Sequence, residues 1–515
     1  MVDEPVRRER KSRRRANAAA PKAERSVNYR QLRNPFTPQT VFGEDRIAEM
    51  HETALRILEE LGLKVLLPQA RRIYAQAGAH VDDETEMVRI GRDIVDAAIR
   101  TAPKSFRLRG GQAHRDVTME PGALVFQAGA GCPHLTDRAR GRRPGTLSDY
   151  LETVKLAQSF DVLHTIGPHV EAQDVPINLR HYAMTRGGLV LSDKPCFIYA
   201  RGTPQVEDSL EMIRIARGVD ADAFREDAWC YTVINTNSPR TLDIPMAQGL
   251  IDMAKVGQPS VVTPFCLAGA MAPVTMAGAI TLQHAEALAA IALTQLVRPG
   301  APVLYGSFSS NVDMKSGSPA FGTPEHVTAT LGSGQLARLI GLPWRAAAAS
   351  AANVADAQAS TETMMSLWGC LMAGVTYVVH SAGWLEGGLT FSLEKMMIDL
   401  EALQTLAELC TPAPAETGDI GFDAIASVEP GGHFFAAEHT MQRYQTAFYD
   451  PLIADWSNFG TWTENGAMTA DERATALWQR KLAEFTPPPM DDARIEELDA
   501  FIAKRTEQGG APPVS

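Results

Sequence analysis

The chain has 515 residues, of which 45% are hydrophobic and 21% are charged, and its formal net charge is −12 at pH 7. This composition is typical of a soluble globular enzyme and excludes a largely disordered chain. No run approaches the roughly 18 apolar residues of a membrane span. The acidic balance also argues against sequence-independent nucleic-acid binding, which requires positive charge.

Residues 1–33 are predicted to form a disordered basic tail. It contains seven closely spaced cations, namely Arg7, Arg8, Arg10, Lys11, Arg13, Arg14 and Arg15. A nucleic-acid or anionic-surface patch is the alternative. The solvated tail is favoured because no aromatic residue is interleaved for base stacking. Residues 506–515, rich in Gly and Pro, are predicted to be a second disordered tail.

Six cysteines are spread through the chain without a CxxC pair: Cys132, Cys196, Cys230, Cys266, Cys370 and Cys410. Several lie in apolar runs. They are therefore expected to be reduced and mostly buried thiols of a cytoplasmic protein.

Residues 34–115 are predicted to form an N-terminal helical cap. Apolar positions at helical spacing occur over 45–62, 67–78 and 91–101. A glycine ends the first of these segments, as expected at a helix C-terminus.

From residue 123 onward, short β-rich apolar runs alternate with longer helical patterns. The eight runs are 123–130, 163–170, 194–200, 229–236, 259–267, 302–308, 343–349 and 376–383. The helices between and after them are expected at 148–159, 205–217, 244–256, 275–297, 324–341, 358–373 and 391–409.

This alternation predicts an α/β protein with a (β/α)8 TIM barrel over residues 116–410. The spacing between successive runs is about 30 to 42 residues, the length of a strand, a loop and a crossover helix. A doubly wound sheet shows the same alternation but usually has fewer strands and an early Gly-rich phosphate turn. The seventh run, PWRAAAA, has poor β propensity and is assigned to a strand by periodicity. Residues 411–505 are expected to be a C-terminal extension packed on the barrel, with a helix near 491–504.

Active sites of such barrels lie at the carboxyl ends of the strands. The residues there are rich in aromatic and neutral polar side chains and poor in Lys and Arg, which does not suit a phosphorylated substrate. Phe265, Phe308 and Trp384 could provide aromatic faces for an organic cation, which gains from the ring quadrupoles. The alternative is that each is a core residue.

Motifs for metal binding or nucleophilic catalysis are weak. Cys132 and His134 form one pair and His433 and His439 another, but neither pair has further ligands at usable spacing, so no metal site is expected. His284 and Glu286 lie within one helical pattern without a second histidine. A buried helix-to-strand contact is favoured over a catalytic role for them.

Segment 259–310 is similar to the core signature of the trimethylamine methyltransferase family. Other matching segments are DKPCFIYA, NTNSPRTLDIPMAQGL, the ADAQAS segment around Gln358, VHSAGWLEGGLTFSLEKMMIDLEAL and GGHFFAAEHT. The resemblance spans about residues 34–505. It implies a barrel enzyme that presents a methylated amine to the Co(I) corrinoid of a partner protein. The cofactor would be carried by that partner, with none bound covalently here.

Members of the family that act on trimethylamine carry pyrrolysine, whereas every residue of this chain is a standard one. A quaternary ammonium leaves as a neutral amine, so its demethylation requires mainly positioning and charge stabilisation. The resemblance to non-pyrrolysine members therefore favours a glycine-betaine-like substrate.

Within this hypothesis, Phe265, Phe308 and Trp384 form an aromatic cage, and His380 and Gln358 orient a carboxylate or polar group. Two other functions stay open. One is a related barrel that uses a pterin methyl carrier, and the other is a quaternary-amine binding protein without turnover. Homo-oligomer formation is expected, whereas nucleic acid and membrane are not expected partners.

Overall fold

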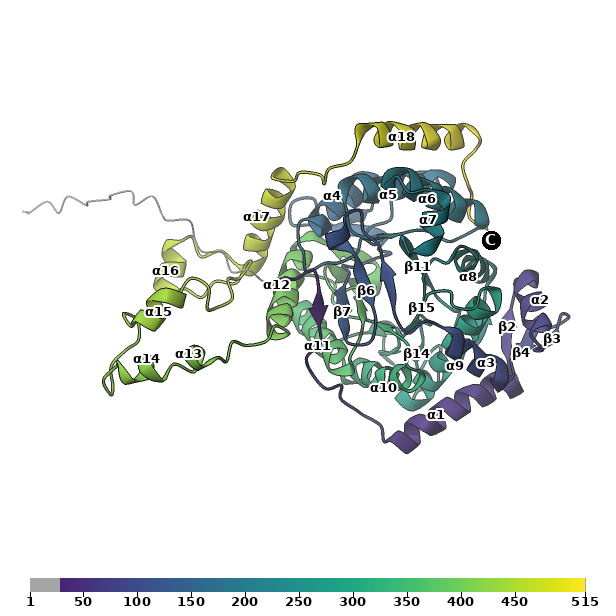
Figure 1. The fold of residues 1–515 in the computed structure, drawn as a ribbon, viewed down its shortest axis with the longest axis horizontal. Helices are drawn as coiled ribbons and strands as arrows, with labels where there is room; N and C mark the ends of the chain where they lie inside the picture. Colours follow the sequence, from purple (N-terminus) through teal and green to yellow (C-terminus); the bar gives the residue numbers. More distant parts are fainter. Residues whose placement is uncertain (1–27, 515) are drawn as a thin grey trace, which may run out of the picture. The chain divides into compact units, whose positions relative to one another are not determined.

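The computed structural model describes residues 28–514. These residues divide into two compact units: one comprises residues 28–411 and 451–514, and the other comprises residues 412–450. The basic cluster between Arg7 and Arg15 lies outside the described residues. The larger unit contains the strands and the ring of helices in Figure 1.

An eight-stranded sheet forms the centre of the larger unit. Seven strands are parallel, and the first in the spatial order is antiparallel to its neighbour. That order is β1 (Leu32–Arg33), β7 (Ala123–Phe126), β19 (Tyr377–Val379), β18 (Trp344–Ala347), β15 (Val303–Gly306), β13 (Ser260–Val262), β11 (Cys230–Ile234) and β10 (Cys196–Phe197). Seven of the eight predicted runs are thus confirmed as strands, including the seventh run as β18.

Helices follow the strands and surround them (Figure 1). They are α4 (Leu147–Gln158), α5 (Ile177–Leu191), α6 (Thr203–Arg217), α8 (Ile244–Val256), α9 (Met276–Val297), α10 (Pro324–Ile340), α11 (Ala357–Ala373) and α12 (Leu393–Leu409), with the short α7 (Ala221–Glu226) after α6. All seven predicted crossover helices are confirmed. Their boundaries have local causes: Thr146 and Asp243 cap two N-termini, and Gly257 and Gly341 end two helices in the left-handed conformation.

The second predicted strand, over 163–170, is the exception. It forms only isolated parallel bridges, Ile166 with Cys196 and Val170 with Cys132. The His164 amide donates to the Phe126 carbonyl of β7, so this segment bonds to strands at both ends of the parallel set. Pro168 has no amide hydrogen to extend a ladder. The sheet is consequently open, and the coarser prediction of an α/β protein is the part that is confirmed.

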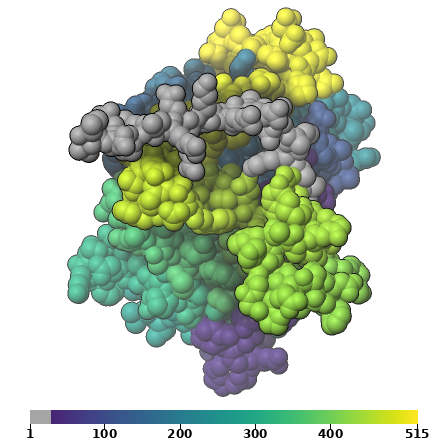
Figure 2. All heavy atoms as spheres, turned by 90° about the vertical axis from the view of Figure 1, so that its left-hand side faces the viewer, coloured from purple at the N-terminus to yellow at the C-terminus, as the bar shows by residue number. Residues whose placement is uncertain are grey.

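The N-terminal region is not purely helical. Helices α1 (Glu44–Arg56), α2 (Pro68–Gln76) and α3 (Arg92–Thr101) match the predicted segments. Between and beside them lie β2 (Leu63–Val65), β3 (His80–Asp82) and β4 (Met87–Arg89), which form a four-stranded sheet with β12 (Thr241–Leu242). Strand β1 also lies inside the predicted tail of residues 1–33, so that prediction is wrong for Leu32 and Arg33. Figure 2 shows α1, in purple, and α18 (Asp492–Glu507), in yellow, at opposite ends of this unit.

The hairpin of β5 (Phe106–Leu108) and β6 (Val117–Met119) packs with residues from the sheet strands. Their shared buried cluster includes Leu108, Met119, Tyr231, Val261 and Tyr377. It fills one face of the sheet, whereas Trp344 and Ala346 of β18 belong to the cluster formed with the surrounding helices. The alternation of side chains along a strand separates these two environments.

Two smaller sheets follow the carboxyl ends of the strands. One contains β20 (Trp384–Leu385), β21 (Thr390–Ser392), β8 (His134–Thr136) and β9 (Arg143–Pro144). The other contains β14 (Leu267–Ala268), β16 (Ser310–Val312) and β17 (Pro319–Ala320). These insertions surround the strand ends where barrel enzymes build their sites.

The C-terminal extension belongs to two units. Residues 412–450 contain α13 (Thr417–Ile420), α14 (Phe422–Ala426) and α15 (Glu438–Arg443), and none of their side chains is fully buried. The larger unit contains α16 (Phe459–Glu464), α17 (Ala470–Ala483) and α18. The predicted disorder of 506–515 is wrong for the described part, because Ala511 is buried and its amide donates to the Asn178 carbonyl.

Among the described residues, α9 is long and apolar enough to cross a membrane, although no sequence run had indicated one. Of its most apolar window, 83% is buried inside the protein. The helix packs against α1, α3, α8 and α10. This burial is the arrangement of a core helix.

Candidate active site

Four of the five predicted site residues meet at the carboxyl ends of the strands. The ring centroids of Phe265, after β13, and Phe308, after β15, are 4.9 Å apart. Phe308 also lies 5.4 Å from His380, after β19, and 5.7 Å from Trp384, in β20. We call these four residues the aromatic cluster.

Phe321 adds a fifth ring that sequence reasoning missed. It stacks on Phe308 at 5.5 Å and meets Trp384 edge-on at 5.4 Å. Phe321 follows β17 in the insertion after β15, away from any predicted strand end, so strand periodicity could not reveal it. It is fully buried, whereas Phe265, Phe308 and His380 are half-buried and can offer surface to a ligand.

His380 is held as a neutral imidazole. The Ala130 amide donates to its Nδ1 at 3.3 Å, so Nε2 carries the hydrogen in this arrangement. Burial, reinforced by the nearby positive charge of Arg345, holds the pKa of His380 well below its ordinary value. The residue has a positive φ of 60°, an uncommon conformation that fixes its direction relative to the strand.

A buried ion pair supports the loop that joins His380 to Trp384. The Lys395 ammonium lies 2.7 Å from a carboxylate oxygen of Asp399, and both side chains are about 2% exposed. The same carboxylate accepts a hydrogen bond from the Gly383 amide at 2.8 Å. Helix α12 therefore holds the backbone immediately before Trp384.

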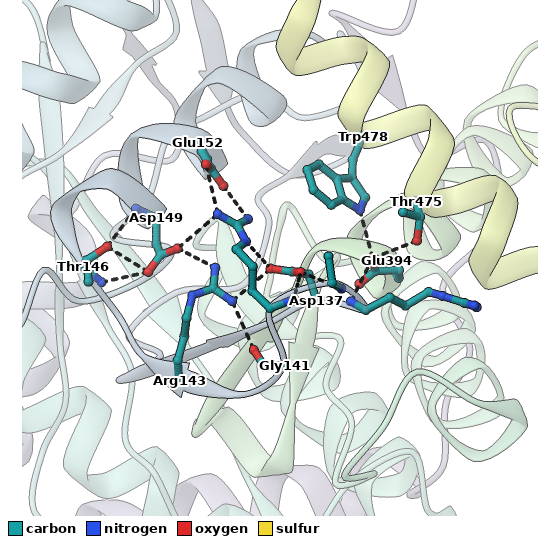
Figure 3. A network of polar contacts seen from close by, with 12 residues as sticks. Asp137, Gly141, Arg143, Thr146, Asp149, Glu152, Glu394, Thr475 and Trp478 are labelled. Atoms are coloured by element: carbon teal, nitrogen blue, oxygen red, sulfur yellow. Dashed lines mark hydrogen bonds and ion pairs between the residues drawn. The ribbon is translucent and has the colours of Figure 1, made fainter.

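A second polar network holds the β8–β9 hairpin, which pairs with β21 beside Trp384. In Figure 3 the Arg143 guanidinium lies between the carboxylates of Asp137, at 2.9 Å, and Asp149, at 2.6 Å. Glu394, at the start of α12, accepts from the Trp478 indole of α17 at 2.9 Å. These bonds join the hairpin to α4, and α17 to α12, so the sheet that carries Trp384 is attached on several sides.

Gln358 does not join the aromatic cluster through any ring or hydrogen-bond contact in the described chain. It is exposed in the first turn of α11, and its side-chain amide donates to Glu362 at 2.7 Å. The other oxygen of Glu362 accepts from the Ser350 hydroxyl and the Ala351 amide, in the loop after β18. Gln358 thus supports that loop through Glu362.

Arg345 is the charged residue of the site that sequence reasoning missed. It lies in β18, is 2% exposed, and its guanidinium carbon lies 4.9 Å from the Phe308 ring centroid. Burial lowers the pKa of Arg345 to about 10, which leaves it charged at neutral pH. The composition of the PWRAAAA run does not indicate that its arginine is buried at the strand ends.

His284 and Glu286 both make buried contacts, of the kind favoured from sequence. His284 bonds to the Tyr305 hydroxyl of β15 at 3.0 Å and to His51 of α1 at 2.9 Å. Glu286 accepts from Thr236 and Ser238 and from the Arg240 amide, which orders the loop after β11. The bond between His284 of α9 and Tyr305 of β15 is the predicted helix-to-strand contact.

No group of three or more His, Cys, Asp or Glu side chains able to hold a metal occurs within residues 28–514. The six cysteines are free and buried, which confirms the predicted burial of these thiols. What the site offers is a set of aromatic faces, a neutral imidazole and a buried guanidinium. Aromatic faces of this kind bind alkylated ammonium groups.

The chain belongs to the trimethylamine methyltransferase family, whose model matches residues 7–510. The resemblance noted from sequence is therefore confirmed. The chain is 34% identical over 473 residues to the glycine betaine methyltransferase of Desulfitobacterium hafniense strain Y51, covering 91% of this chain and 98% of that protein.

The chain is also similar, at lower identity, to two methylamine methyltransferases. Identity is 27% over 474 residues to the trimethylamine methyltransferase MttB of Desulfitobacterium hafniense strain DCB-2, covering 91% of this chain and 94% of that protein. The crystal structure of the Methanosarcina barkeri monomethylamine methyltransferase aligns with a TM-score of 0.46 and 11% identity, covering 90% of this chain and 92% of that one.

Proposed function

We propose that this protein transfers a methyl group from a glycine-betaine-like quaternary amine to the Co(I) corrinoid of a partner protein. The aromatic cluster carries the proposal. Phe265, Phe308 and the buried Trp384 gather at the strand ends. Phe265, Phe308 and His380 are half-buried there and offer surface for a ligand. The similarity to a glycine betaine methyltransferase supports the same substrate class.

The charge of a quaternary amine explains how such a site can work without pyrrolysine, which is absent from the sequence. When one N–CH3 bond breaks, its electron pair stays on nitrogen and the amine leaves neutral. The methyl group forms its new bond to the nucleophilic cobalt. Holding the cation in line and excluding water are then the main tasks of this chain.

The corrinoid would be carried by the partner, which must dock over the strand ends so that its cobalt reaches the methyl group. We expect the interface with this partner to be transient.

We also propose that residues 163–170 complete a closed eight-membered barrel, which their bonds to β7 and β10 support. A cytoplasmic location and a homo-oligomeric state belong to the same proposal.

A methyl-transfer assay tests this function. Purified protein is mixed with Co(I) cobalamin and, in separate reactions, glycine betaine, choline or trimethylamine. The expected result is conversion of the Co(I) spectrum to that of methyl-cobalt with glycine betaine and not with trimethylamine. Binding of glycine betaine without methyl transfer would instead support a binding protein, and transfer to a tetrahydropterin alone would support a pterin-dependent enzyme.

A further inference from the structure

We infer that Arg345 binds the carboxylate of the substrate and makes the site selective for zwitterionic over purely cationic quaternary amines. This inference rests on the proposed function and names a specificity residue for it. It predicts a preference between two ligands that share the trimethylammonium group and differ in the carboxylate.

The first observation is that Arg345 is a buried cation without a counter-ion. No carboxylate of the described chain lies within ion-pair distance of its guanidinium, whereas the buried Lys395 pairs with Asp399. Its Nη1 donates to the Ser307 carbonyl at 3.1 Å, and its Nε is buried with no acceptor. An unpaired buried charge is costly, so a partner supplied by a ligand is the expected complement.

The second observation is the position of this cation. Arg345 and Ala347 share one face of β18, because side chains on a strand alternate. On that face, the residue on the carboxyl side of Arg345 is Ala347, whose side chain is a single methyl group. The guanidinium itself lies against Phe308, whose half-buried ring also contacts Phe265 and Trp384.

A ligand that rests on the accessible part of the Phe308 ring therefore lies near the guanidinium. Its ammonium is attracted by the rings and repelled by Arg345, so a simple cation such as choline binds poorly. A carboxylate on the same ligand turns the net interaction with Arg345 from repulsion to attraction, because it can accept two hydrogen bonds from the planar guanidinium. Opposite charges at such separations change affinity roughly tenfold or more.

The direct test is calorimetric binding of glycine betaine and choline to the wild type, Arg345→Met and Arg345→Lys proteins. The wild type should bind glycine betaine at least tenfold more tightly than choline. Arg345→Met should lose most of that preference, through weaker glycine betaine binding and equal or tighter choline binding. Arg345→Lys, which keeps the charge without the planar donor pair, should lie between them.

The matched control is Arg338→Met. Arg338 also donates to a backbone carbonyl, that of Ala373, but it lies on α10 and makes no contact with the aromatic cluster. It should leave both affinities unchanged. Melting temperatures of all variants separate loss of folding from loss of binding.

Three results would overturn the inference. The wild type could bind choline as tightly as glycine betaine, which needs no variant to fold. Arg345→Met could weaken both ligands equally, or it could keep full glycine betaine affinity. Absence of binding to either ligand by the wild type contradicts the proposed function itself, so the two failures are distinguishable.

Discussion

The imidazole of His380 stacks on the indole of Trp384, with ring centroids 4.6 Å apart and planes 20° from parallel. Both residues follow β19, and the Asp399 carboxylate of α12 binds the Gly383 amide between them. The stack is therefore built on one short loop held by a buried ion pair. These contacts hold His380 and Trp384, two members of the aromatic cluster, in a defined position.

Removal of one ring from the cluster should weaken quaternary-amine binding. Phe308→Leu keeps an apolar side chain but removes the ring that contacts Phe265, His380 and Trp384. Because one cation–π contact contributes about 0.5–2 kcal/mol, glycine betaine affinity should fall about 2- to 30-fold in calorimetry. Phe224→Leu, which changes a buried ring stacked on Trp229, should lower the melting temperature without this loss. Unchanged affinity in folded Phe308→Leu would contradict the cage.

The Lys395–Asp399 pair should be essential for stability and for the geometry of the site. Asp399→Asn leaves a buried ammonium without its counter-ion, and one-sided removal of a buried pair costs about 3–5 kcal/mol in the free energy of unfolding. Urea titration measures this change. Asp222→Asn, in an exposed pair, should cost less than about 0.5 kcal/mol. The account of this loop fails if Asp399→Asn unfolds at the wild-type urea concentration.

Buried histidines should make the protein less stable in mild acid. Burial, together with the nearby Lys194 charge, lowers the pKa of His164 to about 4 from an ordinary value of 6.5. Below pH 6.5 the unfolded chain binds a proton that the folded chain does not, so stability falls as the pH decreases toward 4. From pH 7 to pH 5 this histidine alone should cost about 2 kcal/mol.

His164→Asn tests that contribution. The asparagine oxygen can still accept the Phe126 amide that His164 Nδ1 accepts at 2.9 Å, but it does not titrate. The difference in unfolding free energy between pH 7 and pH 5 should be smaller in the variant than in the wild type. Other titrating groups are common to both proteins and cancel. Equal pH dependence would show that His164 is not held neutral.

Residues 412–450 should be the first segment cut by protease. They contain no fully buried residue, and Phe422, Phe435 and Phe448 are 76–82% exposed. Limited chymotrypsin digestion should cut at these residues. The two fragments should remain together in size-exclusion chromatography, because α17 packs on α12 through the Trp478–Glu394 hydrogen bond. Initial cleavage elsewhere would be inconsistent with this division of the chain.

Much of the fold could be predicted because the helix signals are local. Asp243, Asp356 and the terminal glycines mark helix ends in the sequence itself, and the predicted helices agree with the structure. The strand predicted over 163–170 does not form a continuous ladder. The run contains Pro168, which has no amide hydrogen to donate to a neighbouring strand. The prediction of disorder for the last residues was wrong because a Gly- and Pro-rich composition does not reveal long-range contacts. The Ala511 amide donates to the carbonyl of Asn178, which is far away in the sequence.

Prediction of the site was also limited to residues that have a local sequence signal. Phe265, Phe308, His380 and Trp384 were accessible to reasoning because they end or follow strand-like runs. Phe321 and Arg345 enter the site through tertiary packing, which strand spacing does not encode. Gln358 was assigned from its segment, and its side chain instead bonds to Glu362.

The most direct test of the proposed function follows the methyl group itself. Glycine betaine with ¹³C-labelled methyl groups is incubated with the protein and Co(I) cobalamin, and both products are quantified by mass spectrometry. The account predicts labelled methylcobalamin and dimethylglycine in equal amounts. Failure to form either product, or dimethylglycine without labelled methylcobalamin, would contradict it.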